Sequence, residues 1–86
     1  MQTQYSKVAL KYLAKIDKAS VERIKDAIAG LALKPPAGDI KPMEGYNDGR
    51  FRLRVGKYRV IFKYEDDNSI DILYIIDIGP RGDIYK

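Results

Sequence analysis

Residues 50–62 read RFRLRVGKYRVIF and carry the clearest structural pattern in the chain. Apolar residues at positions 51, 53 and 55 alternate with three arginines, which is the period-2 pattern of a strand that buries one face. Gly56-Lys57 is typical of a two-residue hairpin turn, so a second strand is expected from Tyr58 to about Tyr64. The stretch therefore predicts a β-hairpin whose apolar face packs against the rest of the protein.

The other face of this predicted hairpin is strongly basic. With the turn at Gly56-Lys57, Arg54 lies opposite Arg59, Arg52 lies opposite Ile61, and Arg50 lies opposite Lys63. The segment 49–64 holds six basic and no acidic side chains, although the chain as a whole has 16 basic and 12 acidic ones. Like charges that face each other across a sheet cost stability. We therefore expect five cations with no acid among them to meet an anion such as phosphate. The alternative is an ordinary charged surface that protects a sheet edge.

Two amphipathic helices are expected before the hairpin. Residues 6–16 place Val8, Leu10 or Tyr12, Leu13 and Ile16 at helical spacing, with Ser6 as the N-cap. A second helix of about residues 18–33 follows, capped by Asp17 or Ser20 and stopped by Pro35-Pro36. Since the helices are close in sequence, they should form an antiparallel αα-hairpin. The Pro- and Gly-rich segment 34–49 is expected to be a connecting loop.

After the hairpin, residues 65–68 indicate another turn and residues 69–78 a third strand, which Gly79-Pro80-Arg81-Gly82 should end. The order of these elements predicts an α+β fold. In it, the αα-hairpin packs on one face of a three- to four-stranded twisted antiparallel β-sheet. The length of 86 residues fits one domain, residues 1–86.

The composition excludes several kinds of chemistry. The chain has no Cys and no His, which removes disulfides, thiolate nucleophiles, Ser-His-Asp triads and the common zinc sites. We therefore expect no cofactor and no metal. The N-terminus lacks the features of a signal peptide, and no apolar run approaches the roughly 20 residues of a membrane span. A cytoplasmic location without membrane contact is expected.

The quoted hairpin resembles the F-x-L-R-V-G-x-Y-R-V-I-Y segment of RelE/ParE-superfamily toxins, which belong to type II toxin–antitoxin systems. The ending Gly79-Pro80-Arg81-Gly82-Asp83-Ile84-Tyr85 resembles their closing G-x-R-x-x-x-Y pattern, and residues 5–18 resemble their first helix and helix turn. The resemblance covers nearly the whole chain. It implies two N-terminal helices against a twisted antiparallel sheet, with a preceding first strand for which only residues 1–5 are available.

The resemblance to the RelE branch implies a ribosome-dependent mRNA endonuclease that cuts mRNA in the ribosomal A site. The chemistry expected of these residues is metal-free cleavage. The ribose 2′-OH would attack the neighbouring phosphodiester, and preorganised cations would stabilise the charge that develops. The resemblance implies catalytic roles for Arg59, Arg81 and Tyr85. Arg59 and Arg52 would hold the phosphate, Arg81 would stabilise the transition state or leaving oxygen, and Tyr85 would stack on a base or transfer a proton. Four cations of the face are expected to bind RNA or phosphate: Arg50, Arg52, Arg54 and Lys63.

Two other functions stay open. The ParE branch poisons DNA gyrase and generally lacks the catalytic set, and a degenerate, non-toxic domain that binds RNA or an antitoxin is the third possibility. Arg50 and Arg52 occupy places where the best-known members have Lys, and Arg is a poor proton acceptor. Pro80 stands where many relatives have His or Lys. These departures concern catalysis and leave the expected fold unchanged.

The resemblance also implies a cognate antitoxin as partner. A basic domain suits an acidic, partly disordered segment that folds on binding. The sequence contains no DNA-binding motif, so direct DNA binding is expected from the antitoxin and not from this chain alone.

Overall fold

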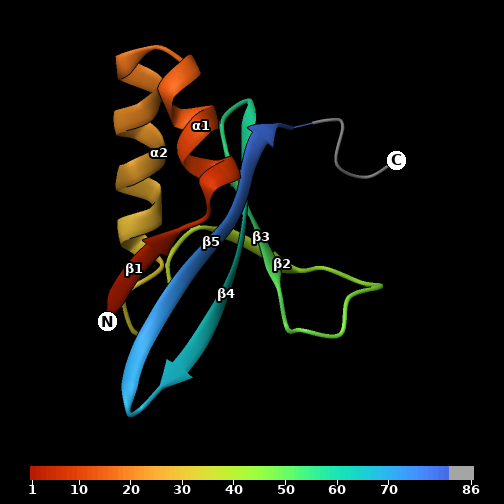
Figure 1. Cartoon of the computed structure of the whole chain (residues 1–86). Helices are drawn as coiled ribbons and strands as arrows, with labels where there is room; N and C mark the ends of the chain where they lie inside the picture. Colours follow the sequence, from red (N-terminus) through yellow and green to blue (C-terminus); the bar gives the residue numbers. More distant parts are fainter. Residues whose placement is uncertain (82–86) are drawn as a thin grey trace.

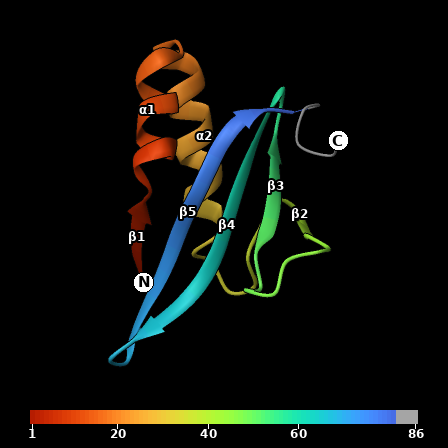
Figure 2. The same cartoon turned by 45° about the vertical axis from the view of Figure 1, so that its right-hand side comes forward.

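The computed structural model describes residues 1–81 and contains a single sheet and two helices (Figure 1). The elements in chain order are β1 (Gln2–Tyr5), α1 (Lys7–Lys15), α2 (Lys18–Gly30), β2 (Asp39–Pro42), β3 (Phe51–Val55), β4 (Tyr58–Asp67) and β5 (Ile70–Pro80). The strand order is β1-β5-β4-β3-β2. The two helices run in opposite directions, side by side on one face of the sheet, as the views in Figures 1 and 2 agree. The α+β class and the packing of an αα-hairpin on one sheet face are therefore confirmed.

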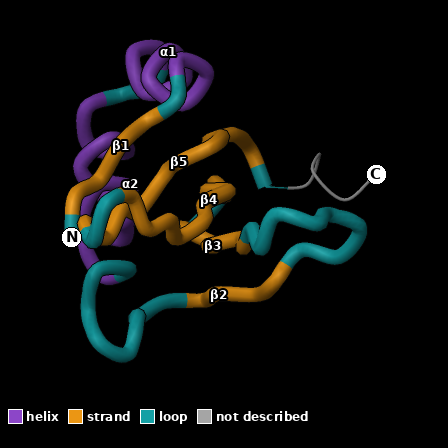
Figure 3. The backbone as a smooth tube through the Cα atoms, turned by 60° about the horizontal axis from the view of Figure 1, so that its bottom comes forward, coloured by secondary structure: helices purple, strands orange, loops and turns teal. Residues whose placement is uncertain are grey.

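The sheet differs from the predicted one in two respects. It has five strands rather than three or four, and it is mixed, because β1 runs parallel to β5. Strand β1 occupies the place that the family resemblance left for a first strand. Strand β2 lies inside the segment 34–49 that was expected to be a loop, and Figure 3 shows it beside β3 with loops at both ends. Both are four-residue edge strands with mostly exposed side chains, so no apolar alternation indicates them.

Both helices begin at a side-chain cap. Ser6 caps α1, since its Oγ accepts a hydrogen bond from the Ala9 N–H, and Asp17 rather than Ser20 caps α2. Helix α2 ends at Gly30, three residues earlier than predicted. The expected apolar stripe of α1 is partly wrong, because Val8 and Leu10 are exposed.

The core lies between the helices and the sheet. It consists of apolar side chains from both helices and from the helix-facing side of β3, β4 and β5: Ala9, Leu13, Ile24, Ile28, Leu31, Leu53, Val55, Tyr58, Val60, Phe62, Leu73, Ile75 and Ile78. Two tyrosine hydroxyls of β4 reach α2 on this side of the sheet: the Tyr64 hydroxyl donates to the Leu31 carbonyl oxygen at 2.7 Å, and the buried Tyr58 hydroxyl donates to Ser20 Oγ at 3.1 Å. The Ser20 hydroxyl in turn donates to Asp17 Oδ1 at 2.7 Å, so the cap of α2 is tied to β4. Within residues 1–81, no helix is both long and apolar enough to cross a membrane.

The register of the first hairpin is confirmed. Residue 51 pairs with 62, residue 53 with 60 and residue 55 with 58, with Gly56 in the left-handed region at φ 58°. The next turn was placed too early, because β4 continues to Asp67 and the turn consists of Asn68-Ser69, both at positive φ as in a type I′ hairpin. The expected break after residue 78 is also wrong, since β5 pairs as far as Pro80.

A β-bulge interrupts the ladder between β4 and β5. Phe62 pairs with Ile75, whereas the preceding Ile61 pairs with Asp77, so Ile76 is an extra residue on β5. The bulge reverses the alternation of faces, and Ile75 and Ile78 therefore both reach the core. Asp77 consequently lies on the opposite side of the sheet from the helices.

Candidate functional site

The candidate site is the face of the sheet opposite the helices, where β3 and β4 present basic side chains. Arg54 lies directly opposite Arg59, and Arg52 lies opposite Ile61, as the hairpin pattern predicts. Strands β2 and β5 flank this pair of strands on either side. The face is therefore four strands wide and begins at the tight turn between β3 and β4.

The expectation that this face holds no acid is wrong. Arg52 Nη1 lies 3.6 Å from Asp39 Oδ1, and Arg54 Nη1 lies 4.0 Å from Asp39 Oδ2. On the other flank, Arg59 Nη2 lies 3.4 Å from Asp77 Oδ2. These carboxylates come from β2 and β5, which the hairpin pattern does not include. The neighbouring strands therefore offset much of the repulsion that the hairpin alone would carry.

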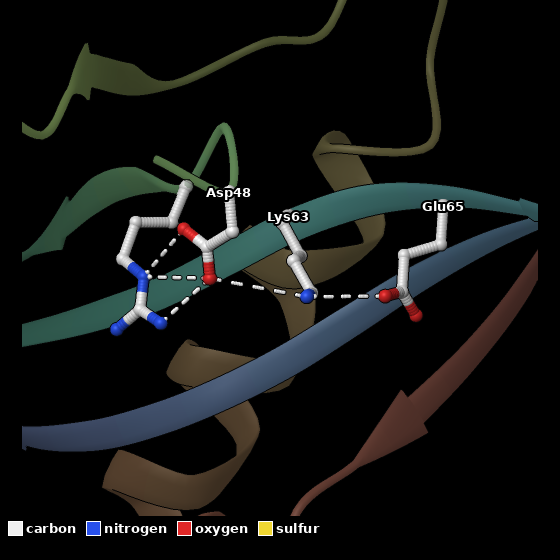
Figure 4. A network of polar contacts seen from close by, with 4 residues as sticks. Asp48, Lys63 and Glu65 are labelled. Atoms are coloured by element: carbon white, nitrogen blue, oxygen red, sulfur yellow. Dashed lines mark hydrogen bonds and ion pairs between the residues drawn. The ribbon is translucent and has the colours of Figure 1, made fainter. Parts of the chain in front are cut away.

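A second network gathers the remaining two cations at the far end of the hairpin. Arg50 donates to Asp48 through Nε and Nη2, with the shortest distance 2.7 Å, and its guanidinium lies 4.3 Å from the ring centre of Tyr46. Figure 4 follows the network from Asp48 to Lys63 and Glu65, with Lys63 Nζ 3.1 Å from Glu65 Oε2 and 3.9 Å from Asp48 Oδ2. The hydrogen bonds from Arg50 lower the pKa of Asp48 and raise that of Arg50 itself. The network fastens the loop before β3 to β4.

Arg52 is buried in the face and Arg59 is mostly buried, so neither side chain projects freely from it. Only 4% of the Arg52 side chain is exposed, and its Nη1 also donates to the Asp39 carbonyl oxygen at 3.3 Å. Arg59 is 12% exposed, and its Nε and Nη1 are buried without a hydrogen-bond partner among residues 1–81. Arg54, in contrast, is 43% exposed. The face thus combines the accessible guanidinium of Arg54 with the guanidinium of Arg59, which has N–H donors without a hydrogen-bond partner among residues 1–81.

Arg81 joins this end of the sheet through the hairpin turn. Its backbone N–H donates to the Lys57 carbonyl oxygen at 2.9 Å, and its Nη1 donates to the Gly56 carbonyl oxygen at 2.9 Å. Gly79 is the partner of Arg59 in the β4–β5 ladder, and Arg81 lies two residues after Gly79 in the chain. Predicted site residues Arg54, Arg59 and Arg81 therefore gather near the turn. Arg50 and Lys63 lie at the other end, and Tyr85 lies outside the described residues.

The hairpin pattern missed the acids that complete this face. Asp39 stands in a strand with no alternating apolar pattern, so its pairing with β3 had no local signal. Asp77 had no local signal either, because apolar residues stand at 72, 73, 75, 76 and 78, and only the structure shows that 73, 75 and 78 reach the core on either side of the bulge. A strict alternation would have directed position 77 toward the helices.

The comparisons with known proteins agree with this fold. A family model described as the ParE toxin of type II toxin–antitoxin systems matches residues 3–85. No curated protein sequence matches the chain significantly.

Solved structures match over nearly the whole chain. The archaeal RelE–RelB complex from Pyrococcus horikoshii OT3 contains a chain with 28% identity and a TM-score of 0.72, covering 95% of this chain and 96% of that one. The RelB–RelE antitoxin–toxin complex from Methanococcus jannaschii gives 26% identity, a TM-score of 0.66 and coverage of 95% and 94%. The YoeB/ParE toxin from Agrobacterium tumefaciens, at 21% identity, has a TM-score of 0.77 and coverage of 94% and 99%.

Proposed function

Because the chain belongs to the ParE toxin family of type II toxin–antitoxin systems, within the RelE/ParE superfamily, we propose that this toxin is a RelE-type mRNA endonuclease. The observation that carries the proposal is the pair of guanidinium groups near the hairpin turn. Arg59 has two buried nitrogens without an acceptor among residues 1–81, and Arg81 donates to the Gly56 carbonyl oxygen of the turn that precedes β4. Phosphate oxygens are the acceptors that suit such donors. The 28% identity with the Pyrococcus RelE–RelB structure supports the same branch.

The proposed reaction takes place on mRNA in the ribosomal A site without a metal. The ribose O2′ loses its proton and forms a bond to phosphorus, while the bond from phosphorus to O5′ breaks and O5′ takes a proton. The products are a 2′,3′-cyclic phosphate and a free 5′-OH. Arg59 stabilises the negative charge on the non-bridging oxygens and Arg81 that on the leaving oxygen. Tyr85, which lies outside the described residues, stacks on a base or transfers a proton.

The other predicted cations take different parts in this proposal. Arg54 is the exposed one and contacts the RNA backbone, and Arg50 and Lys63 contact RNA farther along the face. Arg52 is buried against Asp39, and its contacts with that residue hold β2 onto β3. Its buried charge also makes the electrostatic potential of the face more positive. No cofactor takes part.

A cognate antitoxin is the proposed partner outside the ribosome. The chain carries a net charge of +4, which suits an acidic, partly disordered segment that folds on binding. The Pyrococcus and Methanococcus relatives are RelE–RelB complexes, which supports this pairing. Contact with DNA would then come from the antitoxin.

The test is brief induction in a bacterium, followed by mapping of mRNA 5′ ends. The unaltered chain should produce cuts within translated codons, and Arg59→Ala, Arg81→Ala and Tyr85→Phe should each remove them and relieve growth arrest. Lys25→Ala, which removes an exposed cation from α2, is the control and should leave both effects intact. Full toxicity in all three site variants would contradict the proposed site.

A ParE-like gyrase inhibitor without nuclease activity is the second candidate. One observation favours it: each of the five cations on the face lies within 4.0 Å of one of the protein's own carboxylates. Such pairing suits a protein-binding surface more than a site that must grip a phosphodiester. Intact transcripts together with DNA-damage signalling after induction would establish this candidate. No growth effect at all would indicate a degenerate domain.

A further inference from the structure

The side chain of Arg59 crosses from β4 to the backbone of β5 at Gly79. The two residues are partners in the ladder, and a Cβ added at Gly79 would lie 3.1 Å from Arg59 Nη1 and 3.4 Å from Cζ and Nη2. The distance to Nη1 is shorter than an ordinary van der Waals contact of a Cβ, and the other two lie at the lower limit of that range. The guanidinium therefore lies where β5 has no side chain, and a methyl group at position 79 would shift it by a few tenths of an ångström.

Asp77 holds the guanidinium at one end only. It lies two residues before Gly79 on the same face of β5, as the diagonal cross-strand neighbour of Arg59. Its Oδ2 is 3.4 Å from Arg59 Nη2, and Nε and Nη1 of the same group have no partner among residues 1–81. Asp77 thus restrains the orientation of the group, while two of its three nitrogens lie buried with no acceptor among residues 1–81.

The β-bulge at Ile76 is the reason why Asp77 reaches this face. Without the extra residue, Asp77 would pair with Val60 and point toward the helices. Ile78 would then be the residue that pairs with Arg59. Ser6, the N-cap of α1, holds the bulge: its N–H donates to the Ile75 carbonyl oxygen at 2.9 Å and its hydroxyl to the Ile76 carbonyl oxygen at 2.6 Å. The start of the first helix is therefore connected to the position of Arg59 through two backbone carbonyl groups.

We propose that Asp77 is a positioning residue for Arg59, and that Gly79 provides the space in which the Arg59 guanidinium is held for the scissile phosphate. This inference rests on the proposed endonuclease function. A long arginine side chain loses rotational freedom when it is fixed. If the side chain is already fixed before RNA binds, this loss of entropy no longer adds to the barrier of the cleavage step. Asp77 and Gly79 therefore act on the rate of cleavage and not on the attachment of the toxin to the ribosome.

The experiment measures single-turnover cleavage of mRNA on programmed ribosomes over a range of toxin concentrations. It yields the cleavage rate at saturation and the concentration that gives half of that rate. Asp77→Ala should lower the saturating rate about 10- to 100-fold and leave the half-saturating concentration unchanged. Asp77→Asn retains an oxygen acceptor in the same place and should recover most of the rate. Asp71→Ala, at an exposed position of the same strand, is the matched control and should cleave like the unaltered chain.

The Arg59→Ala variant separates failure of this inference from failure of the proposed function. If Arg59→Ala cleaves normally, the proposed site is wrong. If Arg59→Ala is inactive but Asp77→Ala cleaves at the normal rate, or faster, Asp77 does not position Arg59 and the inference is overturned while the function stands. In the Arg59→Ala background, Asp77→Ala should have no added effect on the residual rate.

Gly79→Ala tests the same idea if Asp77→Ala fails to fold. Position 79 has no positive φ that would disfavour alanine, and the three atoms nearest to the added methyl group all belong to the Arg59 guanidinium. The saturating rate should fall while the half-saturating concentration and the thermal unfolding temperature stay close to those of the unaltered chain. A normal rate in folded Gly79→Ala would refute the role of this space.

Discussion

Arg54 and Arg59 lie directly opposite each other across β3 and β4, yet their guanidinium groups pair with carboxylates on opposite sides of the hairpin. Arg54 pairs with Asp39 of β2, and Arg59 pairs with Asp77 of β5. Two like charges in a directly opposed pair are tolerated because each has its own counter-ion on the next strand. The outer strands thus stabilise an inner hairpin that would be unfavourable by itself.

Removal of Asp39 should destabilise the protein through Arg52. The Arg52 side chain is 4% exposed, and Asp39 supplies its nearby carboxylate. Asp39→Ala leaves that buried charge with one backbone acceptor from the same residue, so the free energy of unfolding should fall by about 1–3 kcal/mol in urea titrations. Asp66→Ala, at an exposed position of β4, should change it by less than about 0.5 kcal/mol. Equal free energies of unfolding for the two variants would show that the Asp39 carboxylate does not stabilise the buried charge of Arg52.

Loss of the Tyr58 hydroxyl should weaken the contact between β4 and the cap of α2. The buried hydroxyl donates to Ser20 Oγ, and Tyr58→Phe removes that donor without changing the ring that packs in the core. The expected loss is about 0.5–1.5 kcal/mol, measured by chemical denaturation. Tyr46→Phe is the matched control, because Tyr46 is exposed, and it should be neutral.

The stability of α2 should depend on pH through its cap. Hydrogen bonds from the Ser20 side chain and backbone lower the pKa of Asp17 below its ordinary value of 3.8. A folded-state pKa below the unfolded one stabilises the protein above pH 3.8, and this contribution disappears as the pH falls through the folded value. Thermal unfolding between pH 7 and pH 2 should therefore show a smaller loss on acidification for Asp17→Ser than for the unaltered chain.

The Asp17→Ser comparison includes its own control for the cap. Serine can accept the same backbone hydrogen bond without a titrating group, so Asp17→Ser should remain folded near neutral pH, whereas Asp17→Ala should lose stability at every pH. If Asp17→Ser responds to acid like the unaltered chain, the acid sensitivity arises from other carboxylates.

Ser6→Ala should be more harmful than the loss of an ordinary helix cap. The Ser6 hydroxyl both accepts from the Ala9 N–H and donates to the Ile76 carbonyl oxygen at the bulge. The variant should lose about 1–2 kcal/mol of unfolding free energy, and amide hydrogen exchange around residue 77 should accelerate. Thr3→Ala, on the exposed edge strand β1, should change neither measurement.

Arg54→Gln should weaken binding of the toxin to programmed ribosomes without unfolding it. Arg54 is 43% exposed and sits 4.0 Å from its only described partner, Asp39. Removing one cation that binds a phosphate of single-stranded RNA lowers the dependence of affinity on salt by about 0.7 of a unit of the logarithmic slope. Binding measured at several salt concentrations checks this. An unchanged slope would remove Arg54 from the RNA-binding surface.

The amino-acid sequence alone was enough to predict the inner hairpin, the Ser6 cap, Asp17 as one of two candidate caps of α2, and the way in which the arginines face one another. These features depend on residues near each other in the chain: the alternation of 51, 53 and 55, the Gly56-Lys57 turn, and the oxygen side chains of Ser6 and Asp17. Local spacing is enough to set which side chains share a face once the turn is known.

The charge of the finished face was decided only by tertiary structure. Asp39 reaches Arg52 from a strand that no local pattern reveals, and Asp77 reaches Arg59 because one bulge residue changes the face on which it lies. Both carboxylates are far in sequence from the arginines that they pair with, and their effect depends on which strands become neighbours in the sheet. Charge counted along a single hairpin therefore overestimates the positive potential of the face, since counter-ions arrive from strands that only folding brings alongside.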